Sequence, residues 1–358
     1  MGVACLTHAT LFSSDTDAMK ISVYLLAILL LIFCLMISVA VGAVFISIPA
    51  IGGILLSQLS FTSIVPDWPA SFATILLEVR LPHTLLIALT GAALAGSGAA
   101  YQGLFRNPLA DPYLIGVASG AGLGAVLGLS LRWPETLLGF YLIPFFAFIG
   151  ALVTVALVYN LARVARTVPL TTLILAGVAV GAFTSSATSF LTLQSNELFY
   201  RALSFLLGGS PVSGWDPVLA ALPYMLVGFV LLTFSGHILN VLQFGEEQAQ
   251  QLGLPVERAK IFVIVVASLT TAGAVAFSGV IGFVGLIVPH TIRILVGADY
   301  RHLIPLSILG GGSALLLADL LARILLAPQS LPVGIVTALI GAPFFLWILR
   351  RAKRQVFW

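Results

Sequence analysis

Charged side chains are scarce in this chain of 358 residues. Asp, Glu, Lys and Arg make up 8% of it, whereas 60% of the residues are hydrophobic and the mean hydropathy is +1.13. A soluble globular domain carries about a quarter charged residues, because its surface faces water. The surplus apolar surface of this chain must therefore meet lipid. The net charge is +3, but the basic residues are scattered at the ends of apolar runs. This distribution does not point to a nucleic acid as a partner.

Motifs for catalysis and metal binding are also lacking. The three lysines are Lys20, Lys260 and Lys353, and none lies in a GxxxxGK[ST] loop that would cradle the phosphates of ATP. There is no HExxH and no paired-cysteine motif, and Cys34 within an apolar run is interpreted as a small packing residue. We therefore predict that the chain is not an enzyme and carries no cofactor or metal of its own. For His290, a packed or hydrogen-bonded side chain is favoured over a metal ligand.

Long apolar runs are abundant. A helix needs roughly 20 apolar residues to cross about 30 Å of hydrocarbon, and ten segments qualify as candidate spans, so the expected fold is an all-α membrane protein. The eighth is short and contains Pro289, which suggests a tilted or broken helix. The ten segments are Ile21–Ile46, Leu85–Leu104, Tyr113–Leu131, Thr136–Leu161, Thr171–Leu191, Val218–Leu239, Ile261–Val280, Val284–Val296, Leu303–Leu326 and Val333–Leu349. Residues 1–19 are expected to form a disordered extension before a single domain over residues 20–358.

The basic residues predict the orientation of the bundle. With ten spans and the N-terminus inside, 12 of the 16 Lys and Arg residues fall on the inner side and four on the outer side. An excess of Lys and Arg marks the cytoplasmic loops of membrane proteins. We therefore expect an even number of spans with both termini in the cytoplasm. The four outer residues are Arg80, Arg132, Arg201 and Arg323.

Glycines recur four residues apart in the third candidate span, at Gly116, Gly120 and Gly124. Small residues with this spacing let helix backbones approach closely in lipid. Tight helix packing is the favoured interpretation, and a glycine-lined substrate path is the alternative.

The longest charged segment is residues 243–260, QFGEEQAQQLGLPVERAK. Good helix formers from Glu246 to Leu252, followed by Gly253 and Pro255, predict a short polar helix on the inner face. It is either a solvated loop helix or a docking helix for a soluble partner, which could transmit rigid-body motion.

A second inner segment, residues 102–112, contains Pro108 and Pro112, which forbid a continuous helix. Asn107 and Asp111 can fix a turn by bonding to local backbone. The segment is either a rigid turn between spans or a gate at the inner mouth of a pathway.

On the outer side, Arg323 follows Asp319 by four residues, which allows an ion pair within one helix. The outer arginines either anchor the chain at the headgroups or dock an acidic patch on an outer partner.

Five stretches carry a resemblance to a known family, and together they cover nearly the whole chain from about residue 20. They are RLPHTLLIALTGAALAGSGAAYQGLFRNPLADPYLIGVASGAGLGA (80–125), ILAGVAVG (174–181), FLLGGSPVSGW (205–215), GFVGLIVPHTIRILVGADYRHLIPLS (282–307) and ADLLARILLAPQSLPVGIVTALIGAPFFLWILRRA (318–352). They resemble the FecCD family of permeases, which import iron-siderophores, haem and vitamin B12.

The resemblance implies a type II ABC importer permease fold with ten spans, in a prokaryotic cytoplasmic (inner) membrane. It also implies a homodimer with the pathway at its interface, two ATPase subunits that bind ATP and Mg²⁺, and an extracytoplasmic binding protein. The expected cargo is a bulky metal chelate: a ferric siderophore, haem or a corrinoid such as vitamin B12. Ferric chelates are favoured because they are the most frequent cargo of the family.

Site residues follow from the same resemblance. Asn107, Pro108 and Leu109 match a cytoplasmic gate, and Leu170 and Thr171 match a second gate segment. Arg80 and Arg323 match arginines that pair with glutamates of the binding protein, and His83 stands where the family often has another arginine. The ATPase-docking region comprises Gly245, Glu246, Glu247, Ala249, Leu252, Gly253, Leu254 and Pro255. Glu247 and Gln248 replace the alanines usual in importer docking loops.

Two other hypotheses stay open. A secondary transporter would work without an ATPase and would need titratable or ion-coordinating groups near the middle of the membrane. An intramembrane enzyme would need a nucleophile with a base, or a metal cluster, within the spans. The sequence offers almost no titratable or ion-coordinating groups near the middle of the membrane. His290 alone does not make a catalytic site or a metal cluster.

Overall fold

The structure is a computed structural model that describes residues 3–42, 44–58, 67–131, 137–165, 167–194, 196–209, 214–327 and 329–356. Within these ranges, side chains are described except for residues 3–20, 137–140, 349 and 351–356. The helices are α1 (Val3–Ala40), α2 (Ile48–Ser57), α3 (Ala70–Thr74), the π-helix η1 (Ile75–Arg80), α4 (Leu81–Leu104), the 3-10 helix η2 (Pro112–Ile115), α5 (Val117–Ser130), α6 (Leu137–Ala162), α7 (Leu170–Thr192), α8 (Asn196–Leu206), α9 (Trp215–Leu242), α10 (Glu246–Gln251), α11 (Val256–Ser278), α12 (Val284–Val296), α13 (Tyr300–Leu325) and α14 (Val333–Val356).

Each of the ten predicted spans corresponds to a helix. Seven helical stretches of the described chain are long and apolar enough to cross a membrane: Ile21–Ala40, Ala70–Leu104, Tyr141–Ala162, Leu170–Thr192, Trp215–Leu242, Val256–Ser278 and Tyr300–Leu325. The other three predicted spans are the shorter apolar helices α5, α12 and the apolar part of α14. The prediction missed α2 and α8, because helices of 10 and 11 residues fall below the length expected of a span.

The helix α1 begins at Val3 and so includes most of the segment for which disorder is expected. Neither glycine nor proline occurs between Gly2 and Gly42. The favourable step of adding residues to an existing helix can therefore continue from the apolar span into the polar segment.

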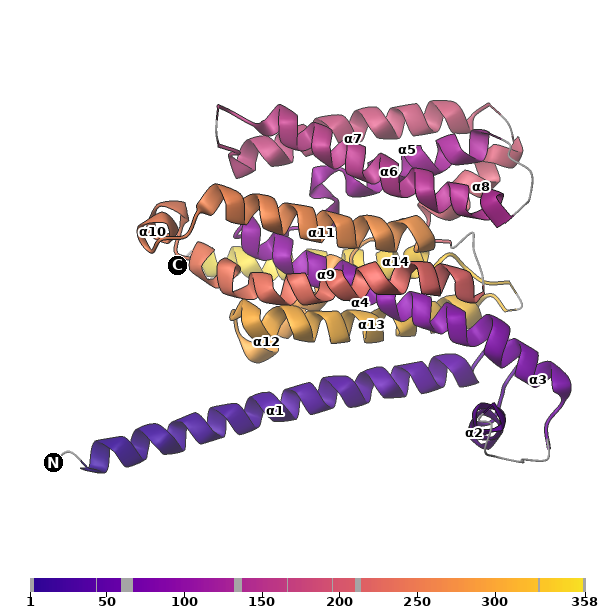
Figure 1. Cartoon of the computed structure of the whole chain (residues 1–358), viewed down its shortest axis with the longest axis horizontal. Coiled ribbons are helices and arrows are strands. Elements are labelled where there is room, and N and C mark those ends of the chain that lie inside the picture. Colours follow the sequence, from indigo (N-terminus) through magenta and orange to yellow (C-terminus); the bar gives the residue numbers. More distant parts are fainter. Residues whose placement is uncertain are drawn as a thin grey trace.

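The centre of the bundle is α4, whose residues from Thr90 to Leu104 are all buried. It packs against α9, α11, α12 and α13, while α5, α6, α7 and α8 form a second group beside α11 (Figure 1). Close approach depends on glycine where α4 crosses α13: a Cβ at Gly91 would overlap the carbonyl oxygen of Gly311, and one at Gly311 would overlap that of Gly91. Such backbone contact is how helices associate in lipid.

The short helix α12 follows a break in the bundle. Thirteen residues span only about 20 Å at 1.5 Å per residue, and the preceding residues 279–283 are not helical. Neighbouring segments satisfy this backbone: Val280 N donates to the carbonyl of Phe205 at 3.0 Å, and the Tyr113 hydroxyl bonds both polar groups of Ile281. Non-helical backbone at membrane depth is tolerated only where protein covers it in this way. The eighth span is short, as expected, but α12 runs unbroken through Pro289, and the break in helical structure lies before it at residues 279–283.

Both termini lie at the same end of the bundle as α10, whereas α2, α3 and α8 lie at the opposite end (Figure 1). An even number of crossings gives this arrangement.

Candidate functional site

The helix α10 stands at one end of the bundle between two glycines with positive φ, Gly245 (φ +107°) and Gly253 (φ +86°). It covers Glu246–Gln251, as the sequence predicted. Positive φ is accessible to glycine at little cost, so the chain can turn sharply before and after the helix. These turns set α10 apart from the ends of α9 and α11.

Two faces of the α10 segment differ in what they contact. The inner face carries Ala249, which is fully buried, and Leu254, which packs against the core. The outer face is exposed and forms a shallow groove lined by Phe244, Gln248, Gln251 and Leu252. Phe244 and Leu252 are 66% and 69% exposed, which is unusual for large apolar side chains at a polar end of the molecule.

The residues of the predicted ATPase-docking set differ in exposure. Ala249 is fully buried against the bundle. Gly245, Glu246 and Leu254 are half-buried. Glu247, Leu252, Gly253 and Pro255 are exposed and remain available. Phe244, Gln248 and Gln251 lie outside the predicted set but share the exposed face with Leu252. The helical spacing from Gln248 to Gln251 and Leu252 could have indicated this shared face.

Glu246 points inward to a buried cation. Its Oε2 atom lies 3.0 Å from Nζ of Lys260, and Glu257 Oε1 lies 2.7 Å from the same nitrogen. The ammonium also donates to the carbonyl oxygen of Val168 at 3.1 Å. The two adjacent glutamates of α10 therefore differ, since Glu246 bonds within the chain and Glu247 faces outward.

The two predicted gate segments lie at turns. In the first, Asn107 Oδ1 accepts a hydrogen bond from Leu109 N at 3.0 Å, and Asp111 Oδ1 accepts one from Tyr113 N at 2.8 Å. Both side chains thus fix the turn as the sequence predicted, with Asn107 and Pro108 exposed. Burial raises the pKa of Asp111 to about 6, against the opposing hydrogen bond from Tyr113.

The second segment, Leu170 and Thr171, forms the first turn of α7. Pro169 precedes it as the N-cap residue, and Val168, which Lys260 contacts, lies one residue earlier. Leu170 packs against the core and Thr171 is exposed. The beginning of α7 is thereby placed next to the ion pairs of α10 and α11.

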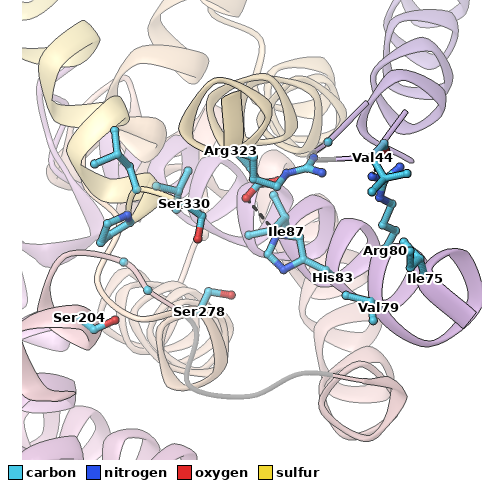
Figure 2. A pocket seen from close by; sticks show the side chains of 17 residues that line it. Val44, Ile75, Val79, Arg80, His83, Ile87, Ser204, Ser278, Arg323 and Ser330 are labelled. Carbon is cyan, nitrogen blue, oxygen red and sulfur yellow. Dashed lines mark hydrogen bonds and ion pairs between the residues drawn. The ribbon is translucent and has the colours of Figure 1, made fainter. Parts of the chain in front are cut away.

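Two of the four predicted outer arginines, Arg80 and Arg323, meet at the opposite end around the C-terminus of α1 (Figure 2). Arg201 lies in α8, and Arg132 is outside the described residues. Arg80 donates to the carbonyls of Val39 and Ala40 at 2.9 and 3.1 Å, and also to that of Val44. Arg323 donates to the carbonyls of Ser38 and Val41 and to the Ser38 hydroxyl. The last carbonyls of a helix have no partner within it, so the two guanidinium groups cap α1.

Asp319 completes this cluster from within α13. Its carboxylate accepts from Arg323 Nε at 2.9 Å, which confirms the predicted i,i+4 pair, and lies 3.0 Å from His83 Nε2. The cluster lines a cavity of about 550 Å³ that Ser278 and Ser330 also border, across from His83 (Figure 2).

Arg80 is only 8% exposed, and its Nη1 and Nη2 atoms donate to carbonyls at the end of α1 that would otherwise lack partners. The His83 side chain is 36% exposed, and that of Arg323 is 17% exposed. His83 is thus the most accessible of the three predicted contacts with a binding protein.

The three predicted packing glycines all face α6. A Cβ at Gly124 would overlap the carbonyl oxygen of Phe146, and one at Gly120 would meet Thr154 and the carbonyl of Gly150. Gly116 differs, because it precedes α5 with φ +84° as its N-cap residue. In each case a larger residue has no room, so these positions belong to the α5–α6 contact.

Nothing in the described part of the chain forms a metal site, since no group of three or more His, Cys, Asp or Glu side chains comes together there. In the same part, Nδ1 of His290 is buried without a hydrogen-bond partner.

Comparison with known proteins decides the family. The sequence model of the FecCD transport family matches residues 30–351. The chain belongs to the FecCD transport family. It is therefore a multi-pass membrane permease, and the spans and partly buried charges above are those of a transport protein.

Relatives with established names are similar over most of their length. The cobalamin import system permease BtuC of Halobacterium salinarum is 46% identical over 282 residues, which cover 79% of this chain and 75% of that protein. The hemin transport system permease HmuU of Yersinia pestis is 42% identical, over 78% of this chain and 84% of that protein. The uncharacterized ABC transporter permease protein YvrB of Bacillus subtilis is 40% identical over 94% of this chain and 95% of that protein.

A solved structure supports the same fold. A metal-chelate type ABC transporter in an inward-facing conformation superposes with a TM-score of 0.77 and 31% identity, over 92% of this chain and 99% of that one. The all-α fold expected from the sequence is confirmed.

Proposed function

We propose that two copies of this chain form the membrane pathway of an ATP-driven importer, with an ATPase subunit bound at α10 of each copy. The observation that carries this proposal is the exposed outer face of α10, where Phe244 and Leu252 are held away from the bundle between Gly245 and Gly253. Exposed apolar side chains at a polar surface mark protein interaction sites. ATP and Mg²⁺ bind to the ATPase subunits, and this chain carries no cofactor.

Transport then follows alternating access. Nucleotide binding closes the ATPase dimer, α10 moves as a rigid lever, and the helices of the two copies tilt about their interface. The turn at Asn107–Leu109 and the beginning of α7 at Leu170–Thr171 open and close the inner mouth. This proposal places α10 and both termini in the cytoplasm, in agreement with the excess of Lys and Arg expected there.

The opposite end receives substrate from an extracytoplasmic binding protein. His83 provides the accessible polar contact at this end, while Arg80 and Arg323 hold α1 in place beside it. The cargo is a metal chelate, as the relatives named for cobalamin, hemin and Fe(3+)-citrate import suggest. A bulky chelate needs little specific polar clamping in the pathway, so the binding protein supplies most of the selectivity.

A substitution on α10 tests the docking of the ATPase. Leu252→Ser replaces a 69% exposed side chain on the outer face of α10. Since a central apolar contact can contribute more than 1.4 kcal/mol to binding, we expect about tenfold less ATPase to copurify. The matched control is Leu193→Ser, a 78% exposed leucine at the other end of the molecule, which should leave the yield of complex unchanged.

Full copurification with Leu252→Ser, together with full ATP-dependent uptake, would contradict docking at α10. Uptake of cyanocobalamin, haemin or ferric citrate by the permease alone, driven by an ion gradient, would instead favour a secondary transporter.

A further inference from the structure

Lys260 is a buried cation with every donor occupied. The residue is 3% exposed, and its ammonium nitrogen lies within 3.1 Å of Glu246, Glu257 and the carbonyl oxygen of Val168. Burying a charge is costly unless it is paired and hydrogen-bonded. The three oxygens around Lys260 therefore form a site built for an ammonium group.

The three partners come from three different segments. Glu246 is the first residue of α10, Glu257 lies in the first turn of α11, and Val168 precedes α7 by two residues. Glu257 also accepts a hydrogen bond from Val168 N at 3.3 Å, so this one residue is held through both its N–H and its C=O. Lys260 and Glu257 together fix the backbone that leads into α7.

The remaining attachment of α10 is small. It has six residues, glycine at both ends, and an inner face on which Ala249 is the buried side chain. In the part of the chain that the structure describes, the polar contacts run from α10 through Lys260 to the segment before α7. A displaced α10 would therefore pull on Lys260, and Lys260 on Val168.

We propose that Lys260 is a coupling residue, which transmits the movement of α10 to the beginning of α7 at Leu170–Thr171. This inference rests on the proposed function, because it takes the ATPase as the source of that movement. Coupling between distant sites is carried by rigid elements joined through hydrogen bonds and ion pairs. Lys260 is such a joint, and it acts by positioning the gate segment without touching the cargo.

The first test uses the permease alone and measures amide hydrogen exchange. Lys260→Met should raise exchange in residues 246–251 and 167–171 together, because it releases both segments at once. Lys260→Arg keeps a positive charge that can bridge the two carboxylates, so it should restore most of the protection. Arg163→Gln removes an exposed cation whose Nε donates to the carbonyl of Ala165, and it serves as the control with unchanged exchange at residues 246–251.

The second test uses the complex with its ATPase subunits. Spin labels on Leu175→Cys in α7 and Leu295→Cys in α12, both 68% exposed, report how far α7 moves when ATP and vanadate trap the complex. In Lys260→Met we expect this movement to fall roughly fivefold or more, while ATP hydrolysis stays within about twofold. Glu246→Ala removes the acceptor that links Lys260 to α10 but leaves Lys260 paired with Glu257, so it should give the same loss if Lys260→Met fails to fold.

The outcomes separate the inference from the function on which it rests. Wild-type movement of α7 in both Lys260→Met and Glu246→Ala would overturn the coupling role, even if hydrogen exchange rises in the first test, because Lys260 would then only stabilise the fold. Failure of the unmodified permease to bind or activate any ATPase would instead overturn the proposed function. Loss of movement in Lys260→Met with recovery in Lys260→Arg would support the inference.

Discussion

At the scale of single residues, the turn after α4 depends on a carboxylate in an unfavourable environment. Asp111 caps η2 through Tyr113 N, yet burial raises its pKa to about 6 from an ordinary value of 3.8. Ionisation therefore costs more in the folded state than in the unfolded chain. The contribution of Asp111 to stability is therefore fully present below its unfolded pKa of about 4 and is lost as the pH rises through about 6.

Asp111→Asn should stabilise the protein at neutral pH. Asparagine keeps the oxygen that accepts from Tyr113 N and removes the buried charge, and each unit of pKa shift is worth about 1.4 kcal/mol. We expect a gain on the order of 1–3 kcal/mol at pH 7.5 that shrinks towards zero at pH 4, measured as the difference in Tm between variant and wild type in detergent. If Asp111→Asn raises the Tm equally at pH 7.5 and pH 4, the carboxylate charge is not the cause of the increase.

At the scale of elements, the contact between α5 and α6 depends on backbone atoms that cannot move aside. Gly124 lies against the carbonyl of Phe146, and Gly150 of α6 lies in turn against the backbone of Gly120. Overpacking costs more where the obstacle is backbone than where it is the end of a flexible side chain.

Gly124→Ala should therefore destabilise the protein by about 1–3 kcal/mol, seen as a lower Tm in detergent. Gly52→Ala in α2 is the matched control, because a Cβ there meets no atom within 4 Å. Alanine also favours the helix over glycine at both positions. If the Tm falls by the same amount in both variants, the close approach of α5 and α6 is not the reason that Gly124 is required.

At the scale of the whole molecule, the two ends of the bundle differ in the residues that they present. One end holds α10, its ion pairs with Lys260 and the two predicted gate turns, and the other holds the cavity beside His83 and Asp319. The termini share the first end (Figure 1). The excess of basic residues predicts that this end faces the cytoplasm.

Labelling of single cysteines in a background without Cys5 and Cys34 tests this orientation. Glu197→Cys in α8 should react with a membrane-impermeant maleimide on intact cells, because α8 lies at the end opposite α10 (Figure 1). Gln250→Cys on α10 is also exposed but should react only after the membrane is permeabilised. The reverse pattern would invert the topology, and with it the assignment of docking and gate residues.

The sequence by itself determined the class of the protein, the location of its spans and the position of α10. These features depend on local properties: apolar run length, basic residues at run ends, and glycine and proline as helix stops. The intrahelical pair of Asp319 and Arg323 and the turn at Asn107 also followed from spacing alone, and the structure confirms both.

Only the tertiary structure decided which side of each element is free. The sequence around Arg80 suits an exposed charge. In the structure, however, Arg80 caps α1, which ends 40 residues earlier. Glu246 and Glu247 are neighbours of the same type, and the buried Lys260 distinguishes them. Lys260 in turn contacts Val168, 92 residues away. A residue's partners at such separations depend on how the helices pack, because no local pattern records which buried group will need a hydrogen bond.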